Sequence, residues 1–131
     1  MCRPFNLQQM KRMRLVMKLL IVEDNPRMRR FIKSLVQDLA EDILECSDGA
    51  EALQSYTDFQ PDWVLMDIKM PRMDGLTASL QIKAAFPEAN ICIVTDYGDQ
   101  KTREAALAAG ACRYVLKEEL HTLRDAISPK A

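Results

Sequence analysis

Short runs of apolar residues alternate along the chain with longer segments in which apolar residues recur every three or four positions. The runs have the length of strands buried on both faces, and the periodic segments have the pattern of amphipathic helices. Turn and capping residues such as Asn25-Pro26 and Ser47-Asp48-Gly49 separate them. The pattern predicts strands at 19–22, 43–46, 63–66, 91–95 and 114–116, and helices at 26–39, 48–59, 76–86, 101–109 and 120–127.

The predicted helices each have an apolar stripe that we expect to face a sheet. Glu51 follows Asp48 at the spacing of a capping box, which predicts how the second helix begins. The residues expected to point inward are Phe31, Ile32, Leu35, Val36 and Leu39 in the first helix, Ala52, Leu53 and Tyr56 in the second, Leu76, Leu80 and Ala84 in the third, and Leu120, Leu123 and Ile127 in the last.

Strands that alternate with helices at these lengths predict an α/β fold, in which a parallel sheet with right-handed crossovers is covered by helices on both faces. The chain has 131 residues, enough for one such domain with a full core. Residues 1–16 carry Arg3, Lys11, Arg12 and Arg14 and no acidic residue, and we expect this basic segment to lie outside the fold, which then occupies 17–131.

Composition removes several function classes. A net charge of -1 and the absence of basic runs mixed with aromatics give no indication of direct nucleic-acid binding, and no apolar stretch is long enough to cross a membrane. The four cysteines are far apart, and Cys46 and Cys92 fall in apolar strands. Buried free thiols in a reducing cytoplasm are therefore the expected state.

The polar residues at the strand ends carry the candidate chemistry. Glu23-Asp24, Asp67, Thr95 and Lys117 each end or follow a predicted strand, so a parallel sheet would bring them to one edge. Carboxylates that converge in one crevice repel each other unless a cation neutralises them, and an incomplete cage of hard oxygens suits Mg²⁺. An amine and a hydroxyl beside them suit an incoming phosphoryl group.

Asp67 is the expected nucleophile at this edge. It follows the apolar run Trp63-Val64-Leu65-Met66, and a carboxylate nucleophile that attacks phosphorus forms an acyl phosphate. Lys117 would offset charge on the transferring oxygens, and the hydroxyl of Thr95 would donate to one of them.

The chain resembles the receiver domain of two-component response regulators over roughly residues 17–127. The resemblance rests on Glu23-Asp24, Asp67, the run Met70-Pro71-x-Met73-Asp74-Gly75, Thr95, Tyr114 and Lys117, all in the family's order. It implies a doubly wound, flavodoxin-like three-layer sandwich with strand order 2-1-3-4-5. It leaves a nitrate-response-like subfamily open as a narrower assignment.

The resemblance also implies partners and residue roles. Asp67 would take a phosphoryl group from a histidine kinase or histidine phosphotransfer protein, with Mg²⁺ held by Asp24, Asp67 and the main-chain carbonyl of Lys69, and with Glu23 assisting through water. Thr95 and Tyr114 would be the switch pair that alters the face made by the predicted elements 101–109, 114–116 and 120–127. Such a protein is a signalling domain rather than an enzyme, catalyses only its own phosphotransfer and dephosphorylation, and passes the signal to an effector or through a phosphorylation-dependent homodimer.

Three departures from the family pattern bear on this site. Glu118 follows Lys117 where the family usually has a proline joined by a cis bond, and we expect a trans or strained bond because a cis bond before another residue costs about 2.5 to 4 kcal/mol. The segment from Lys117 to Leu120 is short, which would reduce the surface used for dimerisation. Asp96 adds negative charge at the mouth of the site, and Lys69 partly offsets it.

Other functions stay open at this point. An enzyme of the haloacid-dehalogenase type also uses a strand-end Asp nucleophile with Mg²⁺, but it needs a second acid two residues later, where this chain has Lys69. A flavin site at the first loop is disfavoured because Glu23-Asp24 would repel a phosphate. An interaction module that is never phosphorylated, and a receiver fragment of a DNA-binding regulator, remain as alternatives.

Overall fold

The computed structural model describes residues 17–128, and the expected basic extension at 1–16 lies outside the described residues. Five parallel strands form one sheet in the order β2-β1-β3-β4-β5, which confirms the predicted topology. The strands are β1 (Met17–Val22), β2 (Ala40–Cys46), β3 (Trp63–Met66), β4 (Ile91–Thr95) and β5 (Arg113–Leu116).

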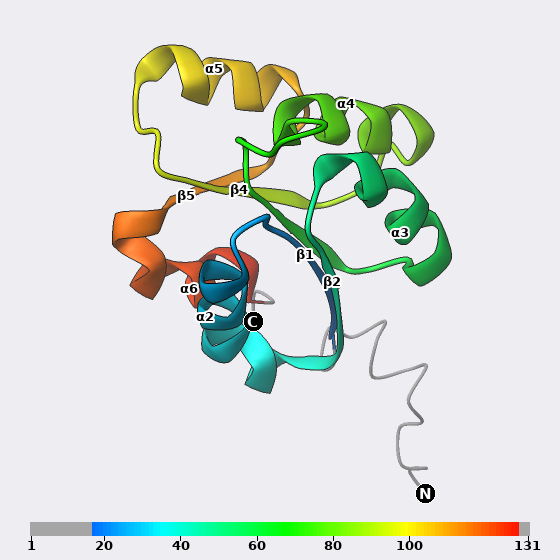
Figure 1. Ribbon diagram of the computed structural model, residues 1–131, viewed down its shortest axis with the longest axis vertical. Helices are drawn as coiled ribbons and strands as arrows, with labels where there is room; N and C mark the ends of the chain where they lie inside the picture. The colour runs from blue at the N-terminus through cyan, green and yellow to red at the C-terminus, as the bar shows by residue number, and fades with distance from the viewer. Residues whose placement is uncertain (1–16, 129–131) are drawn as a thin grey trace, which may run out of the picture.

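Helices cover both faces of the sheet, with α3, α4 and α5 on one face and α2 and α6 on the other (Figure 1). Three short 3-10 segments, η1, η2 and η3, precede β2, α3 and α6 respectively. The helical bounds are α2 (Pro26–Val36), η1 (Gln37–Leu39), η2 (Gly49–Glu51), α3 (Ala52–Phe59), α4 (Gly75–Ala85), α5 (Gln100–Ala108), η3 (Lys117–Thr122) and α6 (Leu123–Ile127).

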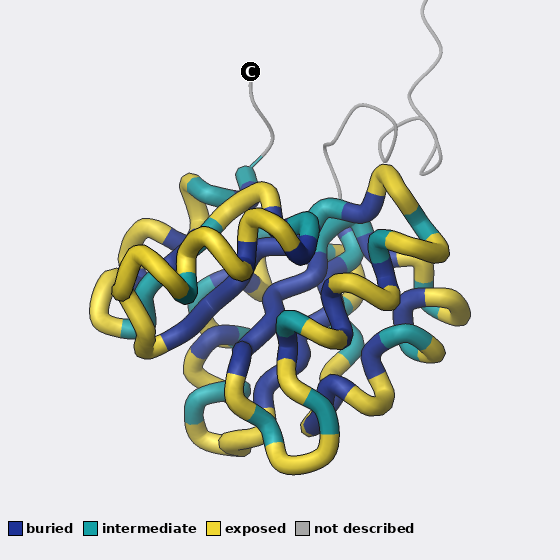
Figure 2. Tube along the Cα trace, turned by 90° about the horizontal axis from the view of Figure 1, so that it is seen from above, coloured by how far each residue is buried: buried dark blue, intermediate teal, exposed yellow. Residues whose placement is uncertain are grey.

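Two apolar cores, one on each face, follow from the alternation of side chains along the strands. In β1, Leu20 and Val22 pack beneath α3 and α4, whereas Leu19 and Ile21 pack against α2 and α6. All four are fully buried, as are the central strands generally (Figure 2). This double burial explains why the strands are continuous apolar runs.

Two predicted helix faces are partly wrong. Phe31 is 51% exposed because α2 presents Ile32 and Val36 to the sheet, one helical turn apart, and Phe31 lies beside that line. Leu80 is 54% exposed and Ala84 is also exposed. The face of α4 that packs on the sheet is instead made of small residues and one large one, Gly75, Ala78, Ser79 and Ile82.

Other sequence predictions are confirmed or corrected by local contacts. Leu120, Leu123 and Ile127 are buried as expected, and Cys46 and Cys92 are buried free thiols. The capping box is wrong: Asp48 accepts a hydrogen bond from Ala50 N, but the Glu51 carboxylate turns outward to Arg72 and Ser47. None of the helices within residues 17–128 is both long enough and apolar enough to cross a bilayer.

Candidate functional site

The site is assembled by the pairing of β1 with β3. Val22 and Met66 are register partners at the ends of these strands. Glu23 follows Val22, and Asp67 follows Met66. The Asp67 N–H donates to the carbonyl of Val22 at 2.9 Å, which holds the two strand ends together. The two carboxylates therefore leave the carboxyl edge of the sheet side by side, where open α/β sheets keep their ligands.

Lys117, which follows β5, reaches both carboxylates. Its Nζ lies 2.9 Å from Glu23 Oε1 and 3.3 Å from Asp67 Oδ2. The other Asp67 oxygen, Oδ1, accepts a hydrogen bond from Ile68 N at 2.8 Å, and Glu23 Oε2 accepts one from Asn25 N at 3.1 Å. Both oxygens of each carboxylate are thus held in a fixed orientation.

Asp24 adds a third carboxylate, and unlike Glu23 and Asp67 it is exposed. One oxygen from each of the three residues lies within 4.8 Å of the others. Three carboxylates face one ammonium here, so the site has an excess of negative charge. An all-oxygen donor set that is open on one side suits Mg²⁺, which keeps several waters.

Burial and crowding change the acidity of these groups. Burial raises the pKa of Glu23 to about 7, and the Asp67 charge acts in the same direction against the lowering effect of Lys117. Burial also raises the pKa of Asp67, although Lys117 and hydrogen bonds from Glu23 and Ile68 oppose it. Burial lowers the pKa of Lys117, but the two carboxylates outweigh it and leave that pKa raised. Without a cation, Glu23 is the carboxyl that keeps a proton near neutral pH.

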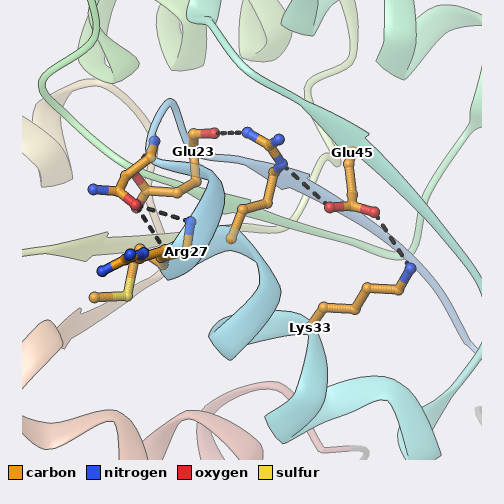
Figure 3. A network of polar contacts seen from close by, with 7 residues as sticks. Glu23, Arg27, Lys33 and Glu45 are labelled. Atoms are coloured by element: carbon orange, nitrogen blue, oxygen red, sulfur yellow. Dashed lines mark hydrogen bonds and ion pairs between the residues drawn. The ribbon is translucent and has the colours of Figure 1, made fainter.

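Arg29 of α2 supports the acidic turn and was not predicted from the sequence. Its Nη1 donates to the main-chain carbonyl of Glu23 at 2.7 Å, and its Nε lies 3.2 Å from Glu45 of β2. Glu45 sits between this arginine and Lys33, one turn further along α2 (Figure 3). The available signal was the acid Glu45 in a strand next to a helix that carries two basic residues four apart, Arg29 and Lys33.

The proposed switch residues both contact the main chain of Tyr97. Thr95 ends β4 and is fully buried, and its hydroxyl accepts a hydrogen bond from Tyr97 N at 3.3 Å. The Tyr114 hydroxyl donates to the carbonyl of the same residue, and the Arg103 guanidinium lies 4.7 Å from the Tyr114 ring centre. Tyr97 therefore links the end of β4 with β5.

The structure shows the local conformation at positions where the sequence differs from the family pattern. No peptide bond in the described residues is cis, so Lys117 and Glu118 are joined by a trans bond, as expected. The 3-10 segment η3 begins at Lys117 itself, directly after β5. Lys69 is exposed, and its ammonium lies 5.1 Å from the ring centre of Tyr97 rather than in the carboxylate cluster.

Comparison with known proteins gives consistent matches over nearly the whole described chain. The family model for the response regulator receiver domain matches residues 19–128. A chemotaxis protein CheY of Listeria monocytogenes is 40% identical over 103 residues, which cover 78% of this chain and 87% of that protein. An uncharacterized transcriptional regulatory protein of Bacillus subtilis, YhcZ, is 39% identical over 104 residues, and the match covers 78% of this chain but 49% of that protein.

Solved structures agree. The crystal structure of a two-component response regulator of the LuxR family from Aurantimonas has a TM-score of 0.80 to this chain, with 29% sequence identity. The alignment covers 86% of this chain and 82% of that one.

Proposed function

Because this chain belongs to the family of response regulator receiver domains, which are phosphoacceptor signalling domains, we propose that Asp67 is the residue that accepts the phosphoryl group. The donor is a histidine kinase or a histidine phosphotransfer protein. The observation that carries this proposal is the contact of Lys117 Nζ with Asp67 Oδ2 at 3.3 Å. An ammonium fixed beside a buried carboxylate can stabilise charge on a phosphoryl group bonded to that carboxylate.

In the proposed step an oxygen of Asp67 forms a bond to phosphorus while the P–N bond of the phosphohistidine breaks. The electron pair of that bond leaves with the imidazole, which takes up a proton from water, and an acyl phosphate remains on Asp67. The Ile68 N–H holds Oδ1, so the carboxylate does not have to reorient before attack. Lys117, whose Nζ contacts both Glu23 and Asp67, would offset the charge that develops on the transferring oxygens.

The carboxylates of Glu23, Asp24 and Asp67 would hold Mg²⁺, with the main-chain carbonyl of Lys69 as a further ligand and Glu23 acting through water. The cation supplies positive charge toward the transferring phosphoryl oxygens when it is bound. The cluster of three carboxylate oxygens within 4.8 Å supports this assignment. Arg29 keeps the main chain of Glu23 in place through its 2.7 Å hydrogen bond.

Thr95 and Tyr114 would report phosphorylation to the surface. The Thr95 hydroxyl, which now accepts a bond from Tyr97 N, would donate to a phosphoryl oxygen instead. A shift of the Tyr97 main chain would then release the Tyr114 hydroxyl from the Tyr97 carbonyl. The face made by α5, β5 and α6 would change, and an effector protein or a second copy of the chain would bind it.

The protein would act as a signalling domain that catalyses only its own phosphotransfer and dephosphorylation. The test is incubation with acetyl phosphate and Mg²⁺, followed by intact-mass measurement for the gain of one phosphoryl group. We expect modification of wild type and none of Asp67→Asn. Asp96→Asn removes an exposed acid near the site and serves as the matched control, which should still be modified.

An unmodified wild type would refute the proposal and favour an interaction module that works by binding alone. Equal modification of wild type and Asp67→Asn would place the acceptor at another residue. A phosphatase would instead be recognised by steady release of inorganic phosphate in many-fold excess over protein from a range of phosphate esters.

A further inference from the structure

The loop that follows Asp67 is closed at its base. Gly75 N donates to the carbonyl of Ile68 at 2.7 Å, and Asp74 caps α4 by accepting from Thr77 N at 2.8 Å. A Cβ added to Gly75 would lie 1.8 Å from the main-chain oxygen of Asp67, so the chain returns directly onto the proposed acceptor. Residues 69–74 therefore form a short loop that is closed where it begins and ends. The middle of this loop has to be held by contacts with another part of the chain.

That support comes from Asp48, in the turn between β2 and α3. Its carboxylate accepts from Arg72 N at 3.0 Å on Oδ2, and from Met73 N at 3.1 Å and Ala50 N at 2.9 Å on Oδ1. Asp48 is only 4% exposed. A helix cap requires only the bond to Ala50, and the other two cross to a loop 24 and 25 residues later in the chain.

The two turns also touch through their main chains. A Cβ on Gly49 would lie 2.4 Å from the carbonyl oxygen of Met73 and 3.1 Å from that of Asp74. Burial raises the pKa of Asp48, but the three N–H donors and Arg72 together outweigh it, and the pKa is held below its ordinary value. Asp48 is thus ionised at neutral pH, and its bonds are charge-assisted, roughly twice as strong as neutral ones.

We propose that Asp48 is a positioning residue for the phosphoacceptor site, whose buried carboxylate holds Arg72 N and Met73 N and thereby fixes the main chain at Lys69. This inference rests on the proposed function, because Lys69 is a proposed Mg²⁺ ligand through its carbonyl. Asp48 would act on that carbonyl through the main chain between residues 69 and 73. Groups that bond directly to a metal ligand typically change metal affinity or activity by about 10- to 100-fold when they are removed, which sets the scale expected here.

Two substitutions separate positioning from capping. Asp48→Ser keeps a good helix cap for Ala50 N, but a single hydroxyl cannot also serve both loop N–H groups. Asp48→Asn keeps Oδ1 and places an amide donor where Oδ2 accepts from Arg72 N. Arg72→Ala is the matched control: it removes the 3.0 Å ion pair with Glu51 and leaves the main-chain N–H in place.

The experiment measures three quantities for each variant: amide hydrogen exchange at residues 72 and 73, the Mg²⁺ concentration for half-saturation from NMR titration, and the phosphorylation rate with acetyl phosphate against Mg²⁺ concentration. We expect Asp48→Ser and Asp48→Asn to exchange faster at these two amides. Half-saturation should need about 10-fold or more Mg²⁺, with a smaller change in the limiting rate at saturation. Arg72→Ala should match wild type.

The inference is overturned if Asp48→Ser binds Mg²⁺ and is phosphorylated as wild type is, because Asp48 would then be a helix cap alone. If Asp48→Ser does not fold, Asp48→Asn decides, since it keeps the cap and Oδ1. Failure of wild type to accept a phosphoryl group would refute the proposed function, whereas the Mg²⁺ titration would still decide whether Asp48 positions the loop.

Discussion

Glu23→Gln tests whether the buried charge of Glu23 lowers the free energy of unfolding. Glu23 is 1% exposed and lies beside Asp67, and burial raises its pKa to about 7. Glutamine has the shape of the protonated acid but cannot ionise. In buffer without divalent cations, we therefore expect Glu23→Gln to be more stable than wild type above neutral pH.

The size of the effect follows from the pKa. Because the folded state favours the protonated carboxyl, this contribution to stability is fully present below the unfolded pKa and is lost as the pH rises through the folded pKa. The pH range over which this contribution is lost therefore runs from 4.5, the pKa of an unburied Glu, to about 7, the pKa of Glu23 in the folded protein. At about 1.4 kcal/mol per pH unit, this window of about 2.5 pH units corresponds to at most about 3 to 4 kcal/mol of unfolding free energy. The attraction of Lys117 already acts against the shift.

The assay is urea unfolding followed by far-UV circular dichroism, with EDTA, at several pH values between about 5 and 8. The curves of wild type and Glu23→Gln should nearly coincide at the acidic end and separate by about 2 to 3 kcal/mol at the alkaline end. Glu45→Gln is the control, because Glu45 pairs with Arg29 and Lys33 and its loss should not stabilise the protein.

Two results would refute this reasoning. If Glu23→Gln were less stable than wild type at about pH 8, the ion pair with Lys117 would outweigh the burial of the charge. If the difference between the two proteins were independent of pH, Glu23 would not change its charge within the window.

Three further predictions concern single side chains and can be checked by urea unfolding. Asp48 has a lowered pKa when folded, so its stabilising contribution is present above the unfolded pKa of 3.8 and is lost as the pH falls through the folded value. The stability difference between wild type and Asp48→Asn should therefore narrow in acid. Leu123→Ala should cost about 2 to 5 kcal/mol because Leu123 is fully buried, whereas Leu107→Ala, at a residue 72% exposed, should stay within about 0.5 kcal/mol of wild type. Gly49→Ala should cost about 1 to 3 kcal/mol, since its Cβ would meet the Met73 carbonyl; a neutral result would mean that the turn yields easily.

The sheet and the acidic cluster could be predicted because both depend on order along the chain. Continuous apolar runs that alternate with helices specify a parallel sheet, and a parallel sheet gathers the residues after each strand at one edge. Glu23, Asp67 and Lys117 lie within ion-pair distance for that reason. Their roles in phosphotransfer stay predictions.

The errors came from helix orientation, which the period alone does not determine. Leu76 and Leu80 form a plausible stripe in the sequence, yet α4 packs on the sheet through Gly75, Ala78 and Ser79. Small residues allow the helix to approach the sheet and the Asp67 main chain closely: a Cβ added to Gly75 would lie only 1.8 Å from the Asp67 main-chain oxygen. A prediction from hydrophobicity places Leu in the core ahead of Gly, so it cannot show where close packing requires a small residue.

The long-range polar contacts were missed because no local pattern encodes them. Arg29 donates to the Glu23 carbonyl, and Asp48 accepts from main-chain N–H groups of a later loop. Main-chain N–H and carbonyl groups occur at almost every residue. A side chain that bonds to them therefore has no partner that the sequence could identify by its residue type. Such contacts surround the carboxylate cluster, where they hold main chain that has no regular hydrogen-bond partner.

The excess of negative charge that we expect to destabilise the pocket would also make the pocket respond to phosphorylation. Three carboxylates share one ammonium, and phosphorylation of Asp67 would replace a charge of -1 by about -2 in the same space. Lys117 cannot satisfy Glu23 and a phosphoryl group equally, so its contact with Glu23 should weaken. The buried Thr95 hydroxyl at the end of β4 accepts from Tyr97 N, and the Tyr97 carbonyl accepts from the Tyr114 hydroxyl. If the Thr95 hydroxyl turned toward a phosphoryl group on Asp67, it would give up its contact with Tyr97 N, and the bond between Tyr97 and Tyr114 would carry that change to β5.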